Sequence, residues 1–396
     1  MKMNQKGKRT VFLSGEDSQE RREECIERLV SDTIPQERRL DYIITVDIFN
    51  EGVDIPEVNQ VIMMRPTESP VIFVQQLGRG LRKAKEKDYH GNLTKAEQQL
   101  ITFISQKLTK GKRPEELMII RDILDGSETD FRLSVYKDKI YSRLGHREST
   151  EALLSAVRNL TNRFAKDSER SKYSDCVFLQ SDGNGGYKVS DELRGMMRDP
   201  DFNRQVKQLT DIGIRNYRKN YSHPYKDTNL SLYQKYTYED VCLLLNWEKN
   251  MNAQNLGGYF YDKVTKQLPV FINYEKSDDA IAYEDRFISP ENLIALSKHP
   301  RKTDSSDADH FYKRTPEDKD NRIYLFIRKN KDDNEAKEFY FLGEIEAEGE
   351  PAPVKMSFNV TDKDGNVTGT KQDDAFEISY HLDVPVREDI YDYIVS

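Results

Sequence analysis

Two arginines and a glutamine at helical spacing carry the clearest chemistry in the sequence. Gln75, Arg79 and Arg82 stand at positions i, i+4 and i+7, so a helix through them presents all three on one face. A guanidinium group pairs bidentately with phosphate oxygens, and two of them on one face form a receptor for a polyphosphate. In phosphoryl transfer, such an arginine stabilises the charge that develops on the transferred group. The alternative is that both arginines form surface ion pairs on an ordinary amphipathic helix.

The elements around these residues predict an α/β arrangement. A polar loop at 47–56 follows an apolar run at 41–46, and this run is typical of a strand that is buried on both faces. A short strand is expected at 10–13, and Ser18 is expected to cap a helix that ends near Val30. A further strand at 61–64 and a helix at 71–82 complete the pattern. Strands that alternate with helices in about 80 residues indicate part of a parallel sheet.

Together, the loop and the helix resemble motifs V and VI of the second RecA-like motor domain of superfamily-two helicases. The run from Thr45 to Pro56 is similar to motif V, and the Gln-x-x-Gly-Arg-x-x-Arg pattern at 75–82 is similar to motif VI. The resemblance implies that Arg79 and Arg82 face the γ-phosphate of ATP. It also implies that Thr45 lies near the nucleic-acid backbone and that the nucleotide-binding residues include Gly52, Asp54 and Gln75.

The sequence departs from this family where the other half of the ATP site would be. A P-loop requires G-x-x-x-x-G-K-[ST], and neither Gly7-Lys8 nor Gly111-Lys112 completes that pattern. No acidic pair follows an apolar strand as in Walker B, and only 44 residues precede Thr45. We therefore expect no ATP hydrolysis by this chain alone. ATP and Mg²⁺ would bind only with the missing first motor domain. That N-terminal motor and nuclease polypeptide would be supplied by a separate chain or by an upstream open reading frame.

A basic stretch in the middle of the chain is a candidate for contact with DNA. Residues 202–226 contain six lysines and arginines against the single acid Asp211, with aromatic residues interleaved. Basic side chains contact phosphates and aromatic rings stack on bases. The residues expected to bind DNA here are Arg215, Arg218 and Lys219. The alternative is the solvated face of an ordinary helix.

The C-terminal region predicts mostly strands. Hairpins are expected from 258–262 with 268–274 and from 322–329 with 338–345, and a half-buried strand is expected at 376–384. A series of segments from 236 onward, among them 236–248, 269–276 and 381–386, resembles the C-terminal domain of SauUSI-like type IV modification-dependent restriction enzymes. This resemblance implies a domain that reads cytosine-modified double-stranded DNA.

A modified-base reader needs an aromatic pocket with a few polar contacts. The candidates for this pocket are Trp247, Tyr259 and Tyr274, and the alternative is that these rings belong to the core of a sheet. The basic loop at 297–302 adds Arg301 and Lys302 as candidates for phosphate contact.

Composition limits the remaining classes of function. The 396 residues carry a net charge of −8, so any contact with nucleic acid must be local. Apolar runs are far shorter than the roughly 20 residues that span a bilayer, which predicts no membrane segment and a cytoplasmic location. Three isolated cysteines and six dispersed histidines indicate neither a disulfide framework nor a metal site.

We therefore expect three parts. Residues 1–90 form a partial α/β RecA-like motor domain, residues 91–235 form a mostly helical connector that contacts DNA, and residues 236–396 form an α+β domain rich in antiparallel strands. The expected function is that of the C-terminal portion of an ATP-dependent DNA helicase or translocase from a restriction or defence system. Two alternatives stay open. One is a non-catalytic DNA-binding protein in which the motor half is only scaffold, and the other is an inactive truncated remnant.

Overall fold

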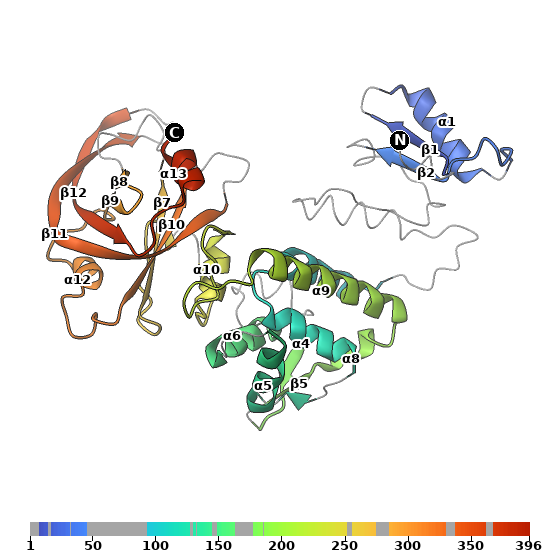
Figure 1. Cartoon of the computed structure of the whole chain (residues 1–396), viewed down its shortest axis with the longest axis horizontal. Helices are drawn as coiled ribbons and strands as arrows, with labels where there is room; N and C mark the ends of the chain where they lie inside the picture. The colour runs from blue at the N-terminus through green and yellow to red at the C-terminus, as the bar shows by residue number, and fades with distance from the viewer. Residues whose placement is uncertain are drawn as a thin grey trace. The chain divides into compact units, whose positions relative to one another are not determined.

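The computed structural model divides the chain into two compact units, each described here by itself (Figure 1). The first unit is Met1–Thr102 with Asp199–Phe202, and the second is Phe103–Arg198 with Asn203–Ser396. The residues that the structure describes are 8–14, 17–31, 33–45, 93–126, 130–131, 133–144, 149–162, 177–184, 186–251, 256–274, 285–329, 337–361 and 367–396.

The first unit contains a strand–helix–strand element. Strand β1 (Thr10–Leu13) pairs in parallel with β2 (Tyr42–Thr45), and helix α1 (Gln19–Val30) lies between them in the chain. The Ser18 side chain caps α1 by accepting a hydrogen bond from the backbone N–H of Arg21, as its position before the helix predicts. These elements confirm the predicted strands at 10–13 and 41–46 and the predicted helix between them. The predicted strand at 61–64 and helix at 71–82 lie outside the described residues.

Helices dominate the middle of the chain. They are α3 (Lys95–Phe103), which continues as the π-helix η2 (Ile104–Leu108), then α4 (Glu115–Leu124), α5 (Leu133–Leu144), α6 (Thr150–Leu160), α8 (Asp191–Met196) and α9 (Pro200–Asn220). A small antiparallel sheet runs in the order β3 (Asp130–Phe131), β5 (Tyr187–Val189) and β4 (Leu179–Ser181). The β4–β5 pair confirms the hairpin that the Gly-rich segment between the two strands predicts.

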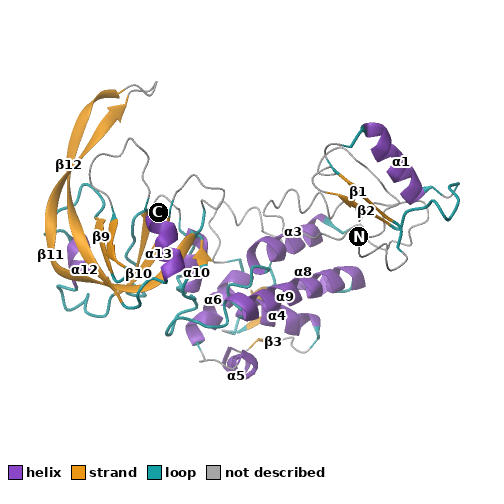
Figure 2. Cartoon of the chain, turned by 45° about the horizontal axis from the view of Figure 1, so that its top comes forward, coloured by secondary structure: helices purple, strands orange, loops and turns teal. Residues whose placement is uncertain are grey.

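The C-terminal part of the second unit, from 230 onward, is built on a curled mixed sheet, which we call the β module (Figure 2). Its strand order is β7 (Gln267–Asn273), β10 (Arg322–Arg328), β11 (Phe339–Thr361), β12 (Val367–Leu382), β9 (Asn292–Leu296) and β8 (Arg286–Ser289), and β6 (Lys235–Tyr236) also pairs with β11. Its helices are α10 (Tyr238–Leu244), α12 (Ser306–Tyr312) and α13 (Glu388–Val395). The pair β10–β7 is parallel, and the other pairs are antiparallel.

Two clusters of buried side chains stabilise the β module. One lies around Leu325, Phe376 and Tyr380, and the other lies around Tyr236, Phe326 and Phe341. Alternate residues of β10 point to different clusters, because successive side chains of a strand point to opposite faces of the sheet. The antiparallel β10–β11 pair confirms the hairpin predicted from 322–345. No described helix combines the length and the apolar character needed to cross a membrane.

Candidate nucleic-acid interface

The predicted motor residues fall largely outside the part of the chain that can be described. Thr45 is the last residue of β2, where its backbone pairs with that of Leu13. The five predicted residues of the ATP site, Gly52, Asp54, Gln75, Arg79 and Arg82, lie outside the described residues. Their roles stay predictions.

Helix α9 presents a basic surface at its C-terminal end. The side chains of Arg215, Arg218 and Lys219 are exposed, and we call these three residues the α9 basic patch. The Arg215 Nε donates to the Asp211 carbonyl oxygen at 3.4 Å within the same helix. No member of the patch forms an ion pair with a carboxylate among the described residues. The three residues of α9 that the sequence predicts to bind DNA are therefore exposed to solvent.

Two other charged residues of α9, Lys207 and Asp211, are paired. The Lys207 ammonium lies 2.7 Å from a carboxylate oxygen of Asp125, and Asp211 forms an ion pair with Arg121. These pairs anchor the middle of α9 to helix α4. Arg215, Arg218 and Lys219 therefore place accessible positive charge near the C-terminal end of the helix.

Two glycines allow α9 to lie very close to the turn that follows η2. Gly111 has a φ of +71°, and a Cβ there would lie 2.3 Å from the Gly213 carbonyl oxygen and 2.5 Å from the Tyr217 nitrogen. Glycine has no Cβ and tolerates positive φ, so it permits this approach. The Asn216 side-chain nitrogen also donates to the Thr109 carbonyl oxygen at 2.7 Å. The α9 basic patch is therefore presented by a firmly packed helix.

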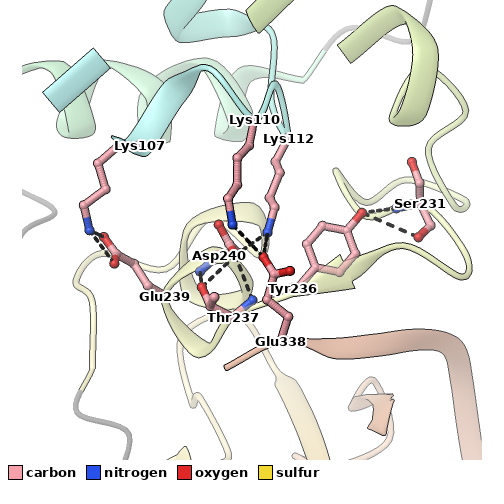
Figure 3. Close-up of polar contacts among 9 residues, drawn as sticks. All are labelled: Lys107, Lys110, Lys112, Ser231, Tyr236, Thr237, Glu239, Asp240 and Glu338. Carbon is pink, nitrogen blue, oxygen red and sulfur yellow. Dashed lines mark hydrogen bonds and ion pairs between the residues drawn. The ribbon is translucent and has the colours of Figure 1, made fainter. Parts of the chain in front are cut away.

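A set of ion pairs joins this helical region to the β module (Figure 3). The Lys107 ammonium lies 2.6 Å from Glu239, and Lys110 lies 2.8 Å from Glu338. Lys112 contacts both Asp240, at 2.6 Å, and Glu338, at 3.1 Å. We call these six residues, Lys107, Lys110, Lys112, Glu239, Asp240 and Glu338, the lysine joint.

Lys112 is the buried centre of the lysine joint, with a side chain only 8% exposed. Burial alone would raise the pKa of the Asp240 carboxyl, but the Lys112 charge and hydrogen bonds from Lys112 and Thr237 hold that pKa below its ordinary value. The Glu338 pKa is also lowered, because the charges of Lys112 and Lys110 outweigh its desolvation. Both carboxylates are thus held ionised by the lysines across the joint.

The C-terminal end of α10 is covered by donors from the helical region. The Arg113 Nη1 donates to the Leu243 carbonyl oxygen at 3.1 Å, and the Arg158 Nη1 donates to the Trp247 carbonyl oxygen at 3.3 Å. Cations at this end of a helix satisfy carbonyls that lack intrahelical partners and favour the helix dipole. Arg113 is itself buried and pairs with Glu116, whose carboxylate also accepts from Asn159.

The basic loop at 297–302 has a mixed electrostatic character. The Arg301 Nε donates to Asp307 Oδ2 at 2.7 Å, whereas Lys302 is exposed. Both residues line a cavity of about 410 Å³ to which Asp304, Asp307 and Asp374 also contribute. Arg301 is therefore held by a carboxylate, and its charge is less accessible to phosphate than that of Lys302.

The three candidate aromatic residues do not come together. Trp247 is buried in the cluster around Phe341, and its Nε1 donates to the Gln267 Oε1 at 3.0 Å. Tyr259 belongs to the other cluster, and its hydroxyl donates to Asp307 Oδ2 at 2.6 Å. Tyr274 packs against that same cluster, and its hydroxyl accepts from the Phe287 backbone N–H at 3.3 Å. The structure therefore places these rings on two sides of the sheet and not around one cavity.

Sequence reasoning missed the lysine joint. The one local signal was Thr237 three residues before Asp240, which is the spacing of a capping box, and the structure contains that capping box. Among the described residues, no group of three or more histidine, cysteine or acidic side chains is arranged to hold a metal ion.

Comparison with known proteins identifies the N-terminal segment most clearly. Residues 1–84 match the family described as "Helicase conserved C-terminal domain". Over 83 residues, the chain is 28% identical to "Putative ATP-dependent helicase IRC3" of Saccharomyces cerevisiae, and the match covers 21% of this chain and 11% of that protein. The N-terminal part of the chain is thus similar to the RecA-like C-terminal lobe of helicases.

The rest of the chain matches domains without an assigned role. Residues 69–221 match "Domain of unknown function (DUF8090)", and residues 230–394 match "Domain of unknown function (DUF3427)". A solved structure described as "Sulfur binding domain and SRA domain of ScoMcrA complexed with phosphorothioated DNA" is 10% identical, with a TM-score of 0.24, and covers 72% of this chain and 89% of that chain. This TM-score is too low to establish a shared fold.

Proposed function

We propose that the chain is the C-terminal part of an ATP-dependent DNA helicase or translocase. The observation that carries this proposal is the match of residues 1–84 to the helicase C-terminal domain. The parallel β1–α1–β2 element supports it, since RecA-like lobes are built on parallel α/β sheets. The spacing of Arg79 and Arg82 supports an arginine-finger role in that lobe.

The chain is proposed to contribute one side of the ATP site. Bound Mg²⁺–ATP supplies the transferable γ-phosphoryl group, and the sequence has no P-loop to hold its phosphates. ATP and Mg²⁺ are therefore assigned to a first motor domain that carries a P-loop. In this scheme Arg79 and Arg82 contact the γ-phosphate, while Gly52, Asp54 and Gln75 help to hold the nucleotide.

The proposed partner is double-stranded DNA, held through phosphate contacts. The α9 basic patch supports this proposal because its cations are exposed and lack carboxylate partners among the described residues. Lys302 is a second candidate contact. The resemblance of the C-terminal segments to modification-dependent restriction enzymes favours a restriction or defence role, with cytosine-modified DNA as the substrate.

The test of the motor proposal is ATP turnover by the chain combined with a P-loop-bearing first motor domain and DNA. Arg82→Ala should lower kcat by about 10³-fold or more, the range typical of an arginine finger. Arg38→Ala, which removes an exposed arginine from the same unit, should leave kcat unchanged. Equal turnover by wild type and Arg82→Ala would favour the scaffold alternative, a non-catalytic DNA-binding protein.

The substrate proposal has its own measurement. Affinities of the full chain for methylated and unmodified duplexes of one sequence should be compared at one salt concentration, because phosphate contacts depend steeply on salt. Tighter binding to the methylated duplex is expected. Equal affinities would remove the modified-base part of the proposal and leave DNA binding intact.

A further inference from the structure

A small cavity lies beside α9 in the second unit. Its volume is about 140 Å³, and its wall includes Lys112, Glu115, Tyr141, Tyr217, Tyr221 and Asn229. At roughly 30 Å³ for each water molecule, this space equals about five waters. A single six-membered heterocycle with its substituents fits such a volume, whereas a peptide or a dinucleotide does not.

Glu115 gives this cavity an unsatisfied polar group. The residue is 1% exposed, and its Oε1 accepts a hydrogen bond from the Tyr141 hydroxyl at 3.0 Å. Its Oε2 is buried and has no hydrogen-bond partner among the described residues. An unpaired buried carboxyl oxygen has lost its hydrogen bonds to water without replacement, so such groups normally meet a partner. A ligand with a hydrogen-bond donor on one edge would provide that partner.

Tyrosine rings form much of the wall. Tyr141 is 3% exposed and Tyr217 is 7% exposed, and Tyr221 is partly buried. Burial raises the pKa of the Tyr217 hydroxyl, and the nearby Glu115 charge raises it further. The phenol therefore stays protonated at neutral pH. Flat aromatic faces next to a hydrogen-bonding carboxyl suit a planar heterocycle better than an aliphatic ligand.

Cations next to the cavity indicate what the heterocycle is attached to. Lys226 lines the cavity itself, although Glu344 and Asp383 engage its ammonium. Arg218 and Lys219 directly follow Tyr217 on α9 and are exposed. Arg218 precedes Tyr221 by three positions in this helical turn, so the two are neighbours on its surface, and a phosphate on Arg218 would lie next to a ring of the cavity. This combination of a tyrosine-lined cavity and a neighbouring exposed cation matches a nucleotide unit of a nucleic-acid strand.

We propose that this cavity binds one unstacked pyrimidine base of bound DNA, with Glu115 hydrogen-bonded to its Watson–Crick edge. A phosphate that flanks this base lies on Arg218. The site is distinct from Trp247, Tyr259 and Tyr274, which the fold places elsewhere. The inference rests on the proposed DNA binding and adds a position for a single base.

The test uses the full chain and a single-stranded oligonucleotide that contains one 5-fluoro-2′-deoxyuridine. A single strand removes the cost of opening a base pair. Binding should produce a second ¹⁹F resonance, shifted from that of the stacked base. Glu115→Gln and Tyr221→Leu should abolish this resonance while changing the overall DNA affinity less than about 3-fold, because phosphate contacts supply most of the affinity.

Three matched variants sharpen the test. Tyr221→Phe keeps the ring and should retain the shifted resonance. Glu151→Gln removes an exposed carboxylate from the same cavity wall and should also retain it. Arg218→Gln should weaken binding but show the resonance at saturating protein.

The two proposals fail in distinguishable ways. If DNA binds and the ¹⁹F spectrum shows one resonance that Glu115→Gln leaves unchanged, the cavity holds water only, and the inference is overturned while DNA binding stands. If no DNA binds at all, both the DNA contact and the base site are overturned.

Discussion

The second unit uses the same residue types in two opposite ways. In the lysine joint and at Arg113, cations are paired with carboxylates and are mostly buried. In the α9 basic patch, arginines and a lysine are exposed and lack such partners among the described residues. This difference shows that a local excess of positive charge in the sequence indicates a binding surface only where the folded chain does not pair those cations with carboxylates. Cations of the first kind should control stability, and cations of the second kind should control affinity.

The largest effect is expected from Arg113→Met. Within the described part of the chain, this change leaves the buried Glu116 carboxylate with Asn159 as its one remaining side-chain partner. Removing one partner of a buried pair typically costs about 3–5 kcal/mol. Urea unfolding of the full chain should show a loss of this size in the free energy of unfolding. A loss under about 1 kcal/mol would mean that Arg113 behaves as a surface residue.

Lys112→Met should cost slightly less, about 3 kcal/mol, because its carboxylate partners retain some exposure. Lys110→Met provides the matched control, since it removes a lysine 57% exposed that pairs with the same Glu338. The control should cost less than about 1 kcal/mol. Equal losses from the two variants would contradict the buried character of the joint.

The lysine joint should also make the free energy of unfolding depend on pH in the acidic range. The pKa values of Asp240 and Glu338 are lowered in the folded chain, so their contribution is fully present above the unfolded pKa of about 4. It is lost as the pH falls through the lower folded values. The free energy of unfolding should be measured from about pH 6 to about pH 3, a range that brackets this window. Below about pH 4 it should fall less steeply in Lys112→Met than in the wild type. The same steepness in both would exclude Lys112 as the cause of these lowered pKa values.

The smallest effect on folding is expected from the α9 basic patch. Arg218→Gln should change the free energy of unfolding by less than about 0.5 kcal/mol. It should reduce the slope of log affinity for DNA against log salt concentration by about 1, as the loss of one phosphate contact does. Lys110→Met should leave that slope unchanged. If Lys110→Met reduced the slope and Arg218→Gln did not, the distinction between the two sets of cations would be wrong.

Local patterns predicted much of the fold. The β1–α1–β2 element, the β4–β5 hairpin and the β10–β11 hairpin each depend on residues close in sequence, and each is present in the structure. The alternation along β12 likewise predicted its buried face, with Phe376, Ile378 and Tyr380 inside.

Long-range contacts were not predictable in the same way. Lys112 pairs with Asp240 and Glu338, which lie 128 and 226 positions away, so no local pattern could identify it. The three aromatic candidates show the same limit, because an aromatic residue has the same sequence signature in a core as in a pocket. Only the sheet topology separates Trp247 from Tyr259.

The parallel pair β10–β7 has a consequence for how the chain folds. Arg328 and Asn273, which pair across these strands, are 55 positions apart, whereas β11 and β12 are joined as a hairpin. Contacts between distant residues close a longer loop and form more slowly than local ones. The hairpin should therefore form first, and β7 should dock afterwards. Trp247, the single tryptophan of the chain, hydrogen-bonds to Gln267 at the start of β7. Its fluorescence would therefore follow a late step in refolding.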